Sequence, residues 1–187
     1  MMYDPTTATP PTPPPEFVRL RPIVACDLPA LFEHQCDAAG ARMAMVSPRT
    51  RVEFDALWAR LLGSPPPRLV ARAIEADGVL VGMINCFQRP GLPEEGATMT
   101  EDGTVRGELD FVGYWLGREH WGRGIATRAL AALLDEVKVR PLLARAATSN
   151  VASLRVLRRC GFVVIGYRQS LAEARFSACE EALLRLE

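Results

Sequence analysis

The sequence predicts a single α/β domain, in which a mixed central sheet of about seven strands is flanked by about four helices. Apolar residues recur at strand and helix periods in the order strand, two helices, three strands, helix, strand, helix and two strands. Because strands follow one another in some places and are separated by helices in others, the sheet is expected to be mixed. The 187 residues are enough for one domain with a sizeable core.

A proline- and threonine-rich segment precedes the domain, which we expect to cover residues 17–187. Residues 1–16 end in a run of five prolines and one threonine over 10–15. Such a segment cannot supply a core, so it predicts a flexible tail. The alternative is a polyproline helix that binds a partner.

Two helices are expected after a first strand at 17–21. The first begins near Asp27, which is placed to cap it. The second begins at a capping box formed by Thr50 and Glu53 and ends at Gly63, before a run of prolines. The apolar residues that share one face are Leu28, Leu31 and Phe32 in the first helix and Phe54, Leu57, Trp58, Leu61 and Leu62 in the second.

Three strands follow. Two of them, over 68–75 and 79–87, flank the hairpin turn at 76–78. The third covers 108–116. The segment between them, 89–107, is rich in Gly, Pro, Glu and Thr and is too long for an ordinary hairpin loop, so we expect it to be either functional or disordered.

The C-terminal part predicts helices and strands in alternation. The expected helices cover 124–137 and 150–160, and the expected strands cover 141–147, 162–167 and 182–186.

Composition excludes several classes of function. The formal net charge is zero, which favours neither nucleic acid nor a membrane surface as a partner. The five cysteines are scattered, without a Cys-x-x-Cys pair, and the N-terminus lacks a secretory pattern. These features indicate a cytoplasmic protein without disulfides. We expect it to be a monomer or a homodimer. His34 and His120 have no Cys or carboxylate at ligand spacing, so no metal site is expected.

The most informative stretch is the junction between the strand at 108–116 and the helix at 124–137. Gly122 and Gly124 leave backbone N–H groups free there, and the positive end of the helix dipole faces the same point. The arginines that can add charge-assisted contacts are Arg118, Arg123 and Arg128. The junction therefore predicts a cradle for a phosphate group.

Two common phosphate-binding designs do not fit this junction. The sequence has no Gly-x-x-x-x-Gly-Lys-Ser/Thr string, as a P-loop would require. A dinucleotide site requires a third small residue and an acid after the next strand, but Thr127 takes the former position and 148–150 contain no acid. A third design places the diphosphate of a cofactor on the amides that open the helix and its thiol-bearing arm along the preceding strand.

Two motifs resemble those of the GNAT N-acetyltransferase superfamily. Trp121-Gly-Arg-Gly-Ile-Ala126 is similar to the signature Arg/Gln-x-x-Gly-x-Gly/Ala. Asn150-Val-Ala-Ser153, followed by Arg159-Cys-Gly-Phe162, is similar to Asn-x-x-Ser, a basic residue and x-Gly-Phe. The Gly-Tyr-Trp-Leu lead-in at 113–116 resembles the branch that includes ribosomal-protein N-terminal acetyltransferases. The motifs cover 111–166, and the order of elements agrees over roughly 17–187.

The resemblance implies a GNAT-like fold with splayed central strands, acetyl-CoA as co-substrate and transfer of its acetyl group to a primary amine. The residues expected to bind the cofactor are Trp115, Leu116, Arg118, Trp121, Gly122, Arg123, Gly124, Ile125, Ala126, Thr127, Asn150 and Ser153. Asn150 is also a good helix cap, and the tryptophans are equally explained by packing.

The catalytic groups are less clearly indicated. Phe111 stands where the related branch often has a Glu, and Glu108 and Asp110 should face the opposite side of the strand. Glu108 and Asp110 are the candidate bases, and the 89–107 loop offers further acids: Glu94, Glu95, Glu101 and Asp102. Leu157 replaces a Tyr that many family members use to protonate the leaving thiolate. We therefore expect Ser153 to hydrogen-bond the leaving sulfur.

The acceptor amine is not identified by the sequence. Its pocket should lie between the two N-terminal helices, the 89–107 loop and the C-terminal strands. Met43, Met45, Phe54 and Trp58 either line this pocket or belong to the core. The alternative function is a non-catalytic acyl-CoA-binding module, which Phe111 and Leu157 favour. A third alternative is a structural or interaction protein that binds a partner through its proline-rich tail.

Overall fold

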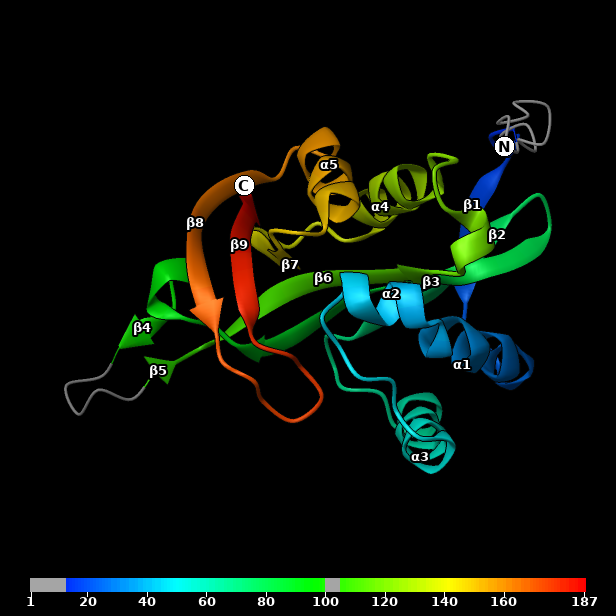
Figure 1. Ribbon diagram of the computed structural model, residues 1–187, viewed down its shortest axis with the longest axis horizontal. Coiled ribbons are helices and arrows are strands. Elements are labelled where there is room, and N and C mark those ends of the chain that lie inside the picture. The colour runs from blue at the N-terminus through cyan, green and yellow to red at the C-terminus, as the bar shows by residue number, and fades with distance from the viewer. Residues whose placement is uncertain (1–12, 100–104) are drawn as a thin grey trace, which may run out of the picture.

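A single seven-stranded sheet with helices on both faces forms the centre of the protein (Figure 1). The computed structural model describes residues 13–99 and 105–187. The strand order is β1-β2-β3-β6-β7-β9-β8. The strands are β1 (Val18–Pro22), β2 (Val70–Ala76), β3 (Val79–Pro90), β6 (Glu108–Leu116), β7 (Leu142–Ala147), β8 (Val163–Ser170) and β9 (Cys179–Leu186). The predicted mixed α/β fold and its seven-stranded sheet are confirmed.

The described residues form five α-helices that flank the sheet, one more than the sequence predicts. Helices α1 (Leu28–Cys36), α2 (Ala38–Met43) and α3 (Arg51–Gly63) cover one face, and α4 (Ile125–Glu136) and α5 (Val151–Arg159) cover the other (Figure 1). The unpredicted helix is α2, which has six residues and is too short to show a helical period. The Asp37 side chain caps it by accepting the Gly40 N–H at 2.7 Å.

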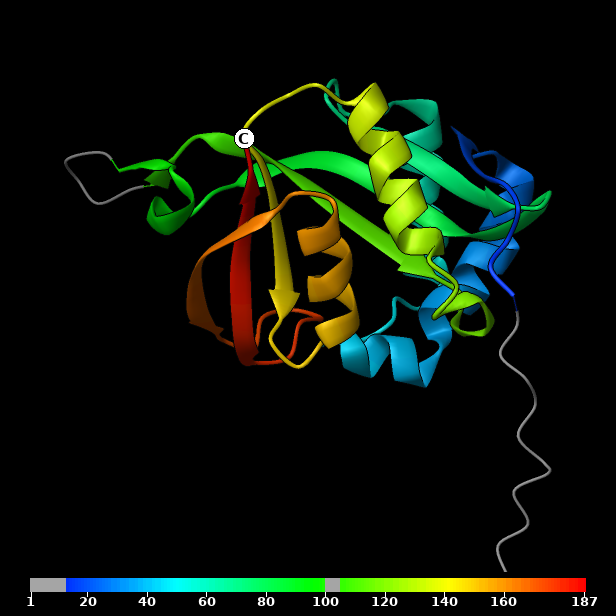
Figure 2. The same ribbon diagram turned by 90° about the horizontal axis from the view of Figure 1, so that it is seen from above.

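The two central strands diverge. All neighbouring strands are antiparallel except β6 and β7, which are parallel and pair only at Phe111 and Leu143. The rest of β6 toward Leu116 therefore has no ladder on its β7 side, and Figure 2 shows the two strands separating with α4 and α5 on either side of the gap. The splayed strands expected from the family resemblance are present.

Two apolar clusters hold the helices to the sheet. The larger packs α4 and α5 against the strands through residues such as Leu130, Leu133 and Leu157. The smaller joins α1 and α3 to the opposite face, and it includes Phe54 and Trp58. Removing this apolar surface from water is what fixes both helix layers.

Asp27 does not act as predicted. It stands at the N-cap position of α1, but its side chain accepts no hydrogen bond from that helix. Instead it accepts the Val24 N–H at 2.9 Å and a bidentate pair from the Arg21 guanidinium at 2.6 and 2.8 Å. A 3-10 turn over Ala25–Asp27 precedes α1 and turns the carboxylate back toward β1. The Arg21 guanidinium lowers the pKa of Asp27.

The 89–107 segment is partly ordered. It contains the end of β3, a 3-10 turn at Pro93–Glu95 and the short strands β4 (Thr98–Met99) and β5 (Val105–Arg106). Glu95 is buried, and it forms a bidentate ion pair with Arg145 of β7. Glu101 and Asp102 lie outside the described residues, as do the first twelve residues of the predicted tail.

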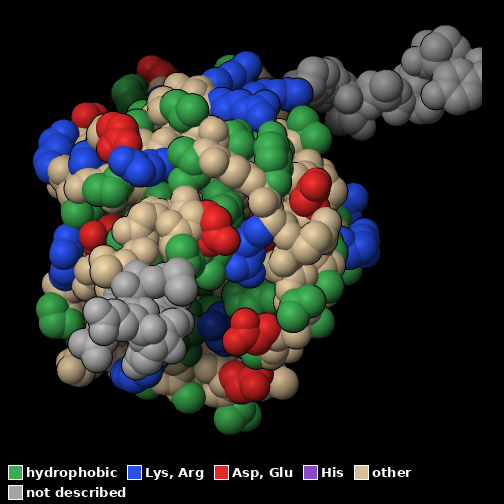
Figure 3. Space-filling model, turned by 90° about the vertical axis from the view of Figure 1, so that its left-hand side faces the viewer, with side chains coloured by type: hydrophobic (Ala, Val, Ile, Leu, Met, Phe, Trp, Pro, Cys, Tyr) green, Lys and Arg blue, Asp and Glu red, His purple; other side chains and the backbone are tan. Residues whose placement is uncertain are grey.

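Charges of both signs are interspersed on the face that carries β8 and the β4–β5 pair (Figure 3). This distribution agrees with the net charge of zero. None of the helices described here is long and apolar enough to cross a bilayer.

Replacing Asp27 by Asn should lower the free energy of unfolding by about 2 kcal/mol at pH 7, because Arg21 and the Val24 amide lose a charged acceptor. Since folding lowers the pKa of Asp27, its contribution is present above the unfolded pKa and is lost as the pH falls. The difference between the two proteins should therefore shrink below about pH 4. Urea unfolding across pH measures both effects.

Asp55→Asn is the matched control. Asp55 is exposed on α3 and pairs with Arg51 one helical turn away, so its loss should cost less than about 0.5 kcal/mol. If the two variants lose equal stability, the Arg21–Asp27 pair does not have the role given to it here.

Candidate active site

A cavity of about 270 Å³ opens between the first turns of α4 and α5, and we call it the helix-end cavity. Residues of α2 and the end of β6 complete its wall. The predicted cofactor-binding residues that line it are Trp115, Leu116, Trp121, Gly122, Gly124, Ile125, Ala126, Thr127, Asn150 and Ser153. Arg118 and Arg123 do not line it. The fold thus brings together two motifs that lie about one helix and one strand apart in the sequence.

The start of α4 presents free donors to this cavity. Gly122 and Gly124 both have a φ of +73°, a conformation that other residues adopt only with strain. Gly124 is the N-cap and has no side chain to cap the helix, and the first turn carries no acidic residue. The amides over 122–127 donate no hydrogen bond to any described residue. The helix dipole and these N–H groups together favour an anion at this point.

The three arginines near the junction contact other parts of the chain. Arg118 lies 4.0 Å from the Asp37 carboxylate. Arg123 donates to the Pro13 carbonyl at 2.9 Å, and Arg128 donates to the carbonyls of Pro15 and Glu16 at 2.7 and 2.8 Å. The residues just before β1 therefore lie beside the N-terminal half of α4.

Both tryptophans of the junction have structural partners. The indole N–H of Trp115 donates to the His34 carbonyl at 2.8 Å and ties β6 to α1. The indole N–H of Trp121 donates to the Leu116 carbonyl at 3.1 Å. The Leu116 carbonyl is thus already hydrogen-bonded. The backbone of β6 before it has no ladder on the β7 side, so that edge is open to a ligand.

A second cavity, of about 280 Å³, fills the gap between β6 and β7, and we call it the splay cavity. Tyr114 and Ser153 line both this cavity and the helix-end cavity. Their hydroxyl oxygens are 2.8 Å apart. Asn150 caps α5 by accepting the Ser153 N–H at 3.0 Å, as predicted. Burial raises the pKa of Tyr114 to about 12, so the phenol stays protonated at neutral pH.

The pairing of Tyr114 with Ser153 was not predicted from the sequence. The two residues are 39 positions apart, and only the splay brings them together. One signal was available: strand alternation places Tyr114 on the same side as Val112, the side that packs against α4 and α5.

The carboxylates near β6 occupy different environments. Glu108 is exposed and borders a third cavity, which lies on the face covered by α1 and α3. Asp110 is buried, pairs with Arg68 at 3.0 Å and lines none of the three cavities. Glu94 is exposed and Glu95 is held by Arg145.

Phe111 is buried at the point where β6 and β7 part. Its ring stacks on Phe87, with centroids 6.2 Å apart. The guanidinium groups of Arg89 and Arg145 lie 4.3 and 5.2 Å from its centroid. The position where the related branch often has a carboxylate is therefore apolar and flanked by two cations.

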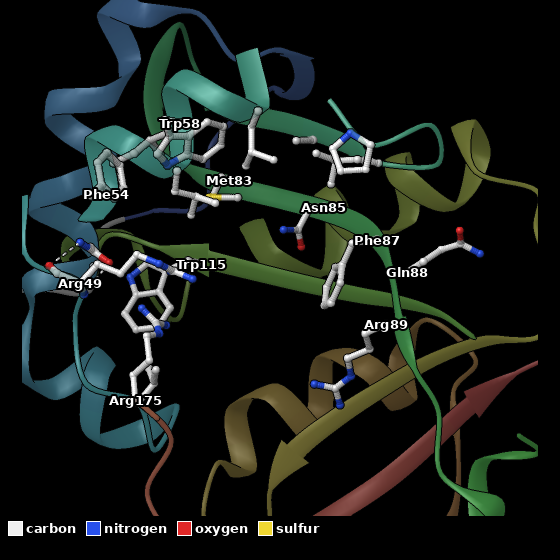
Figure 4. A pocket seen from close by; sticks show the side chains of 18 of the residues that line it. Arg49, Phe54, Trp58, Met83, Asn85, Phe87, Gln88, Arg89, Trp115 and Arg175 are labelled. Atoms are coloured by element: carbon white, nitrogen blue, oxygen red, sulfur yellow. Dashed lines mark hydrogen bonds between the residues drawn. The ribbon is translucent and has the colours of Figure 1, made fainter. Parts of the chain in front are cut away.

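The third cavity, the largest of the three at about 660 Å³, lies on the face covered by α1 and α3, and we call it the α3 cavity. Its apolar wall includes Phe54, Trp58, Met83 and Phe87 (Figure 4). It shares Trp115 with the helix-end cavity and Arg89 with the splay cavity. Met43 and Met45 line the helix-end and splay cavities instead. The three cavities therefore border one another around β6.

A carboxylate does lie beside His34 and His120, contrary to the expectation from the sequence. The fold brings His34, Glu119 and His120 together, with a Glu119 oxygen 3.8 Å from His34 Nε2 and 3.3 Å from His120 Nε2. Their ligand atoms all lie within 4.8 Å of one another. Burial lowers the pKa of both histidines. The absence of a metal remains a prediction.

Comparison with known proteins agrees with this geometry. The family model for the acetyltransferase (GNAT) domain matches residues 18–163. The chain therefore belongs to the GNAT acetyltransferase family, which confirms the resemblance drawn from the two motifs.

A curated relative is the probable N-acetyltransferase YjcK of Bacillus subtilis (strain 168), 31% identical over 93 residues. The match covers 46% of this chain and 43% of the relative, so the chain aligns with less than half of that protein.

Solved structures share the fold. The spermidine N-acetyltransferase of Vibrio cholerae, in complex with CoA and spermine, has a TM-score of 0.70 at 14% identity, over 90% of this chain and 94% of that chain. RimJ of Mycobacterium smegmatis, in complex with CoA-disulfide, has a TM-score of 0.67 at 23% identity, over 90% of this chain and 81% of that chain.

Replacing Gly124 by Ala should test the cradle. At a φ of +73° the added Cβ should cost about 1–2 kcal/mol of stability and tilt the first-turn amides. We expect CoA affinity, measured by calorimetry, to fall at least fivefold. The matched control is Gly63→Ala at the end of α3, where a Cβ meets nothing within 4 Å and φ is ordinary. Equal CoA affinity in the two variants would exclude the cradle as the binding element.

Proposed function

We propose that this protein transfers the acetyl group of acetyl-CoA to a primary amine, by direct attack of the amine in a ternary complex. The observation that carries the proposal is that the free amides over 122–127 border the helix-end cavity and that the Tyr114–Ser153 pair borders both this cavity and the adjoining splay cavity. Membership in the GNAT family and the CoA bound by two structural neighbours support it.

The cofactor would be held in two parts. Its diphosphate accepts hydrogen bonds from the amides over 122–127, where the charge of the helix end adds to them. Its amide-rich arm pairs with the open edge of β6 near Trp115, as an added strand would. Asn150 uses its Oδ1 to cap α5, which leaves its side-chain N–H groups free for this arm. Arg118 and Arg123 would bind the diphosphate only after leaving Asp37 and Pro13.

In the reaction, the amine nitrogen attacks the thioester carbonyl carbon and the C–S bond breaks. The nitrogen loses one proton and the thiolate gains one, so the step is neutral overall. Ser153 hydrogen-bonds the leaving sulfur and is oriented by Tyr114, whose phenol remains protonated. The hydroxyls of Tyr114 and Ser153, on β6 and α5, would thus take over the role of the single Tyr that many family members have at the position of Leu157.

Glu108 is the better placed of the two candidate bases. It borders the α3 cavity and is solvent-accessible, so it can accept the amine proton through water. Asp110 would act only indirectly, because it is buried against Arg68. An amine with a pKa near 10 is mostly protonated at neutral pH, so a proton acceptor is required.

Ser153→Ala should lower kcat by tenfold or more, about 1.4 kcal/mol in activation free energy. Tyr114→Phe should lower kcat in the same direction and leave the KM for acetyl-CoA within about twofold. Because the two hydroxyls form one unit, the double variant should lose little more than the worse single variant. Tyr167→Phe, at an exposed position of β8, is the control. An unchanged kcat in Ser153→Ala would refute the role given to Ser153.

A non-catalytic acyl-CoA-binding module remains the rival function. Release of free CoA from acetyl-CoA, followed with a thiol reagent across a panel of amines, separates the two functions. We expect amine-dependent release. Tight acetyl-CoA binding by calorimetry without release for any amine would support the module instead.

A further inference from the structure

The α3 cavity has an unusual balance of charge. Four arginines line it, Arg49, Arg68, Arg89 and Arg175, and Glu108 is the only carboxylate among the described residues of its lining. Asp110 pairs with Arg68 and neutralises it. The side chains of the other three form no hydrogen bond or ion pair with any described residue. The exposed Glu53 carboxylate attracts Arg49 and Arg175 without forming a hydrogen bond or an ion pair with either, so the cavity keeps an excess of positive charge.

Some of the guanidinium N–H groups of these arginines are also buried. Nε and Nη1 of Arg175 and Nε of Arg89 are buried without an acceptor. Burial lowers the pKa of all three guanidinium groups, that of Arg89 to about 10, and repulsion from Arg49 adds to the effect on Arg175. Like charges brought together out of water are destabilising unless an anion joins them.

The positions of Arg49 and Arg175 are fixed by the backbone. Gln35 of α1 holds Arg49 with two hydrogen bonds, to its carbonyl at 3.1 Å and from its amide at 3.3 Å. The Ser47 amide donates to the Arg175 carbonyl at 2.7 Å, which joins the β8–β9 connection to the chain after α2. Figure 4 shows both side chains next to Trp115, with Arg89 farther along the cavity beside Phe87.

We infer that the acetyl acceptor is a small amine that also carries a carboxylate, which Arg49 and Arg175 bind together. The inference rests on the proposed function. A carboxylate offers two acceptors to the two unpaired guanidinium groups, and charge-assisted bonds of this kind are strong and directional. Trp115 borders both this cavity and the helix-end cavity, so an amine extending past it points toward the thioester.

The volume of the α3 cavity and the residues that line it narrow the class of acceptor further. A volume of about 660 Å³ suits a small molecule. Phe54, Trp58 and Met83 offer an apolar surface to the body of the acceptor. A polyamine carries only positive charge and would meet three unpaired guanidinium groups, so it does not fit. The acceptor class is an α-amino acid or a similar amino carboxylate with an apolar side chain.

The first test compares the rates of acetylation of acceptors that differ in charge. CoA release is measured with apolar L-amino acids, the corresponding amino acid amides, spermidine and short peptides. We expect kcat/KM at least tenfold higher for an amino acid than for its amide, and no turnover of spermidine. Amides that equal the acids, or preference for spermidine or for peptides without an acidic side chain, would overturn the inference.

The second test uses variants. Arg175→Gln and Arg49→Gln should each raise the KM for the amino acid at least tenfold, leave kcat within about threefold and leave the amide unaffected. Arg60→Gln, at an exposed position near the end of α3, is the matched control and should change none of these values. An unchanged KM in both variants would overturn the inference, and an unchanged KM for acetyl-CoA shows that each variant is folded.

A binding measurement separates this inference from the proposed function. Calorimetry with des-amino carboxylates, such as 3-phenylpropanoate, does not depend on acetyl transfer. Binding that weakens at least tenfold in Arg175→Gln supports the carboxylate site even if no amine is acetylated. Absence of such binding, with turnover of uncharged amines, overturns the site and leaves the proposed function intact.

Discussion

The candidate site depends on one constraint: β6 and β7 are neighbours in the sheet but pair only at Phe111 and Leu143. On either side of this point the sheet is an ordinary antiparallel structure, with β3 paired along β6 and β9 paired along β7. Because α4 packs on one half and α5 on the other, the divergence also separates the starts of the two helices. The open strand edge, the splay cavity and the helix-end cavity all follow from the same separation.

Buried ion pairs hold the frame around this gap. Glu95 reaches from the 89–107 segment to Arg145 on β7, and Arg21 joins Asp27 and Glu75 at the other end of the sheet. Each pair connects parts of the chain that no local pattern relates. Breaking such a pair leaves a buried charge without a partner, which is why these contacts constrain the fold even where their net contribution to stability is small.

The elements with strong local signals were predictable from the sequence. The capping box at Thr50 and the glycines at 122 and 124 act within a few residues, and both are present. The features that the sequence did not predict, or predicted wrongly, lack a local pattern. Asp27 is drawn to Arg21 across a 3-10 turn, the phenol of Tyr114 meets Ser153 only through the splay, and α2 is too short to have a period. The four arginines of the α3 cavity come from four separate segments, so composition alone could not reveal their excess charge.

The arrangement of the cavities has a kinetic consequence. The helix-end cavity opens between α4 and α5, whereas the α3 cavity lies on the face covered by α1 and α3, and they meet only at Trp115. If the cofactor and the acceptor bind as proposed, each enters by its own route and neither obstructs the other. The architecture then imposes no obligatory order of addition, and the acetylated product can leave while CoA is still bound.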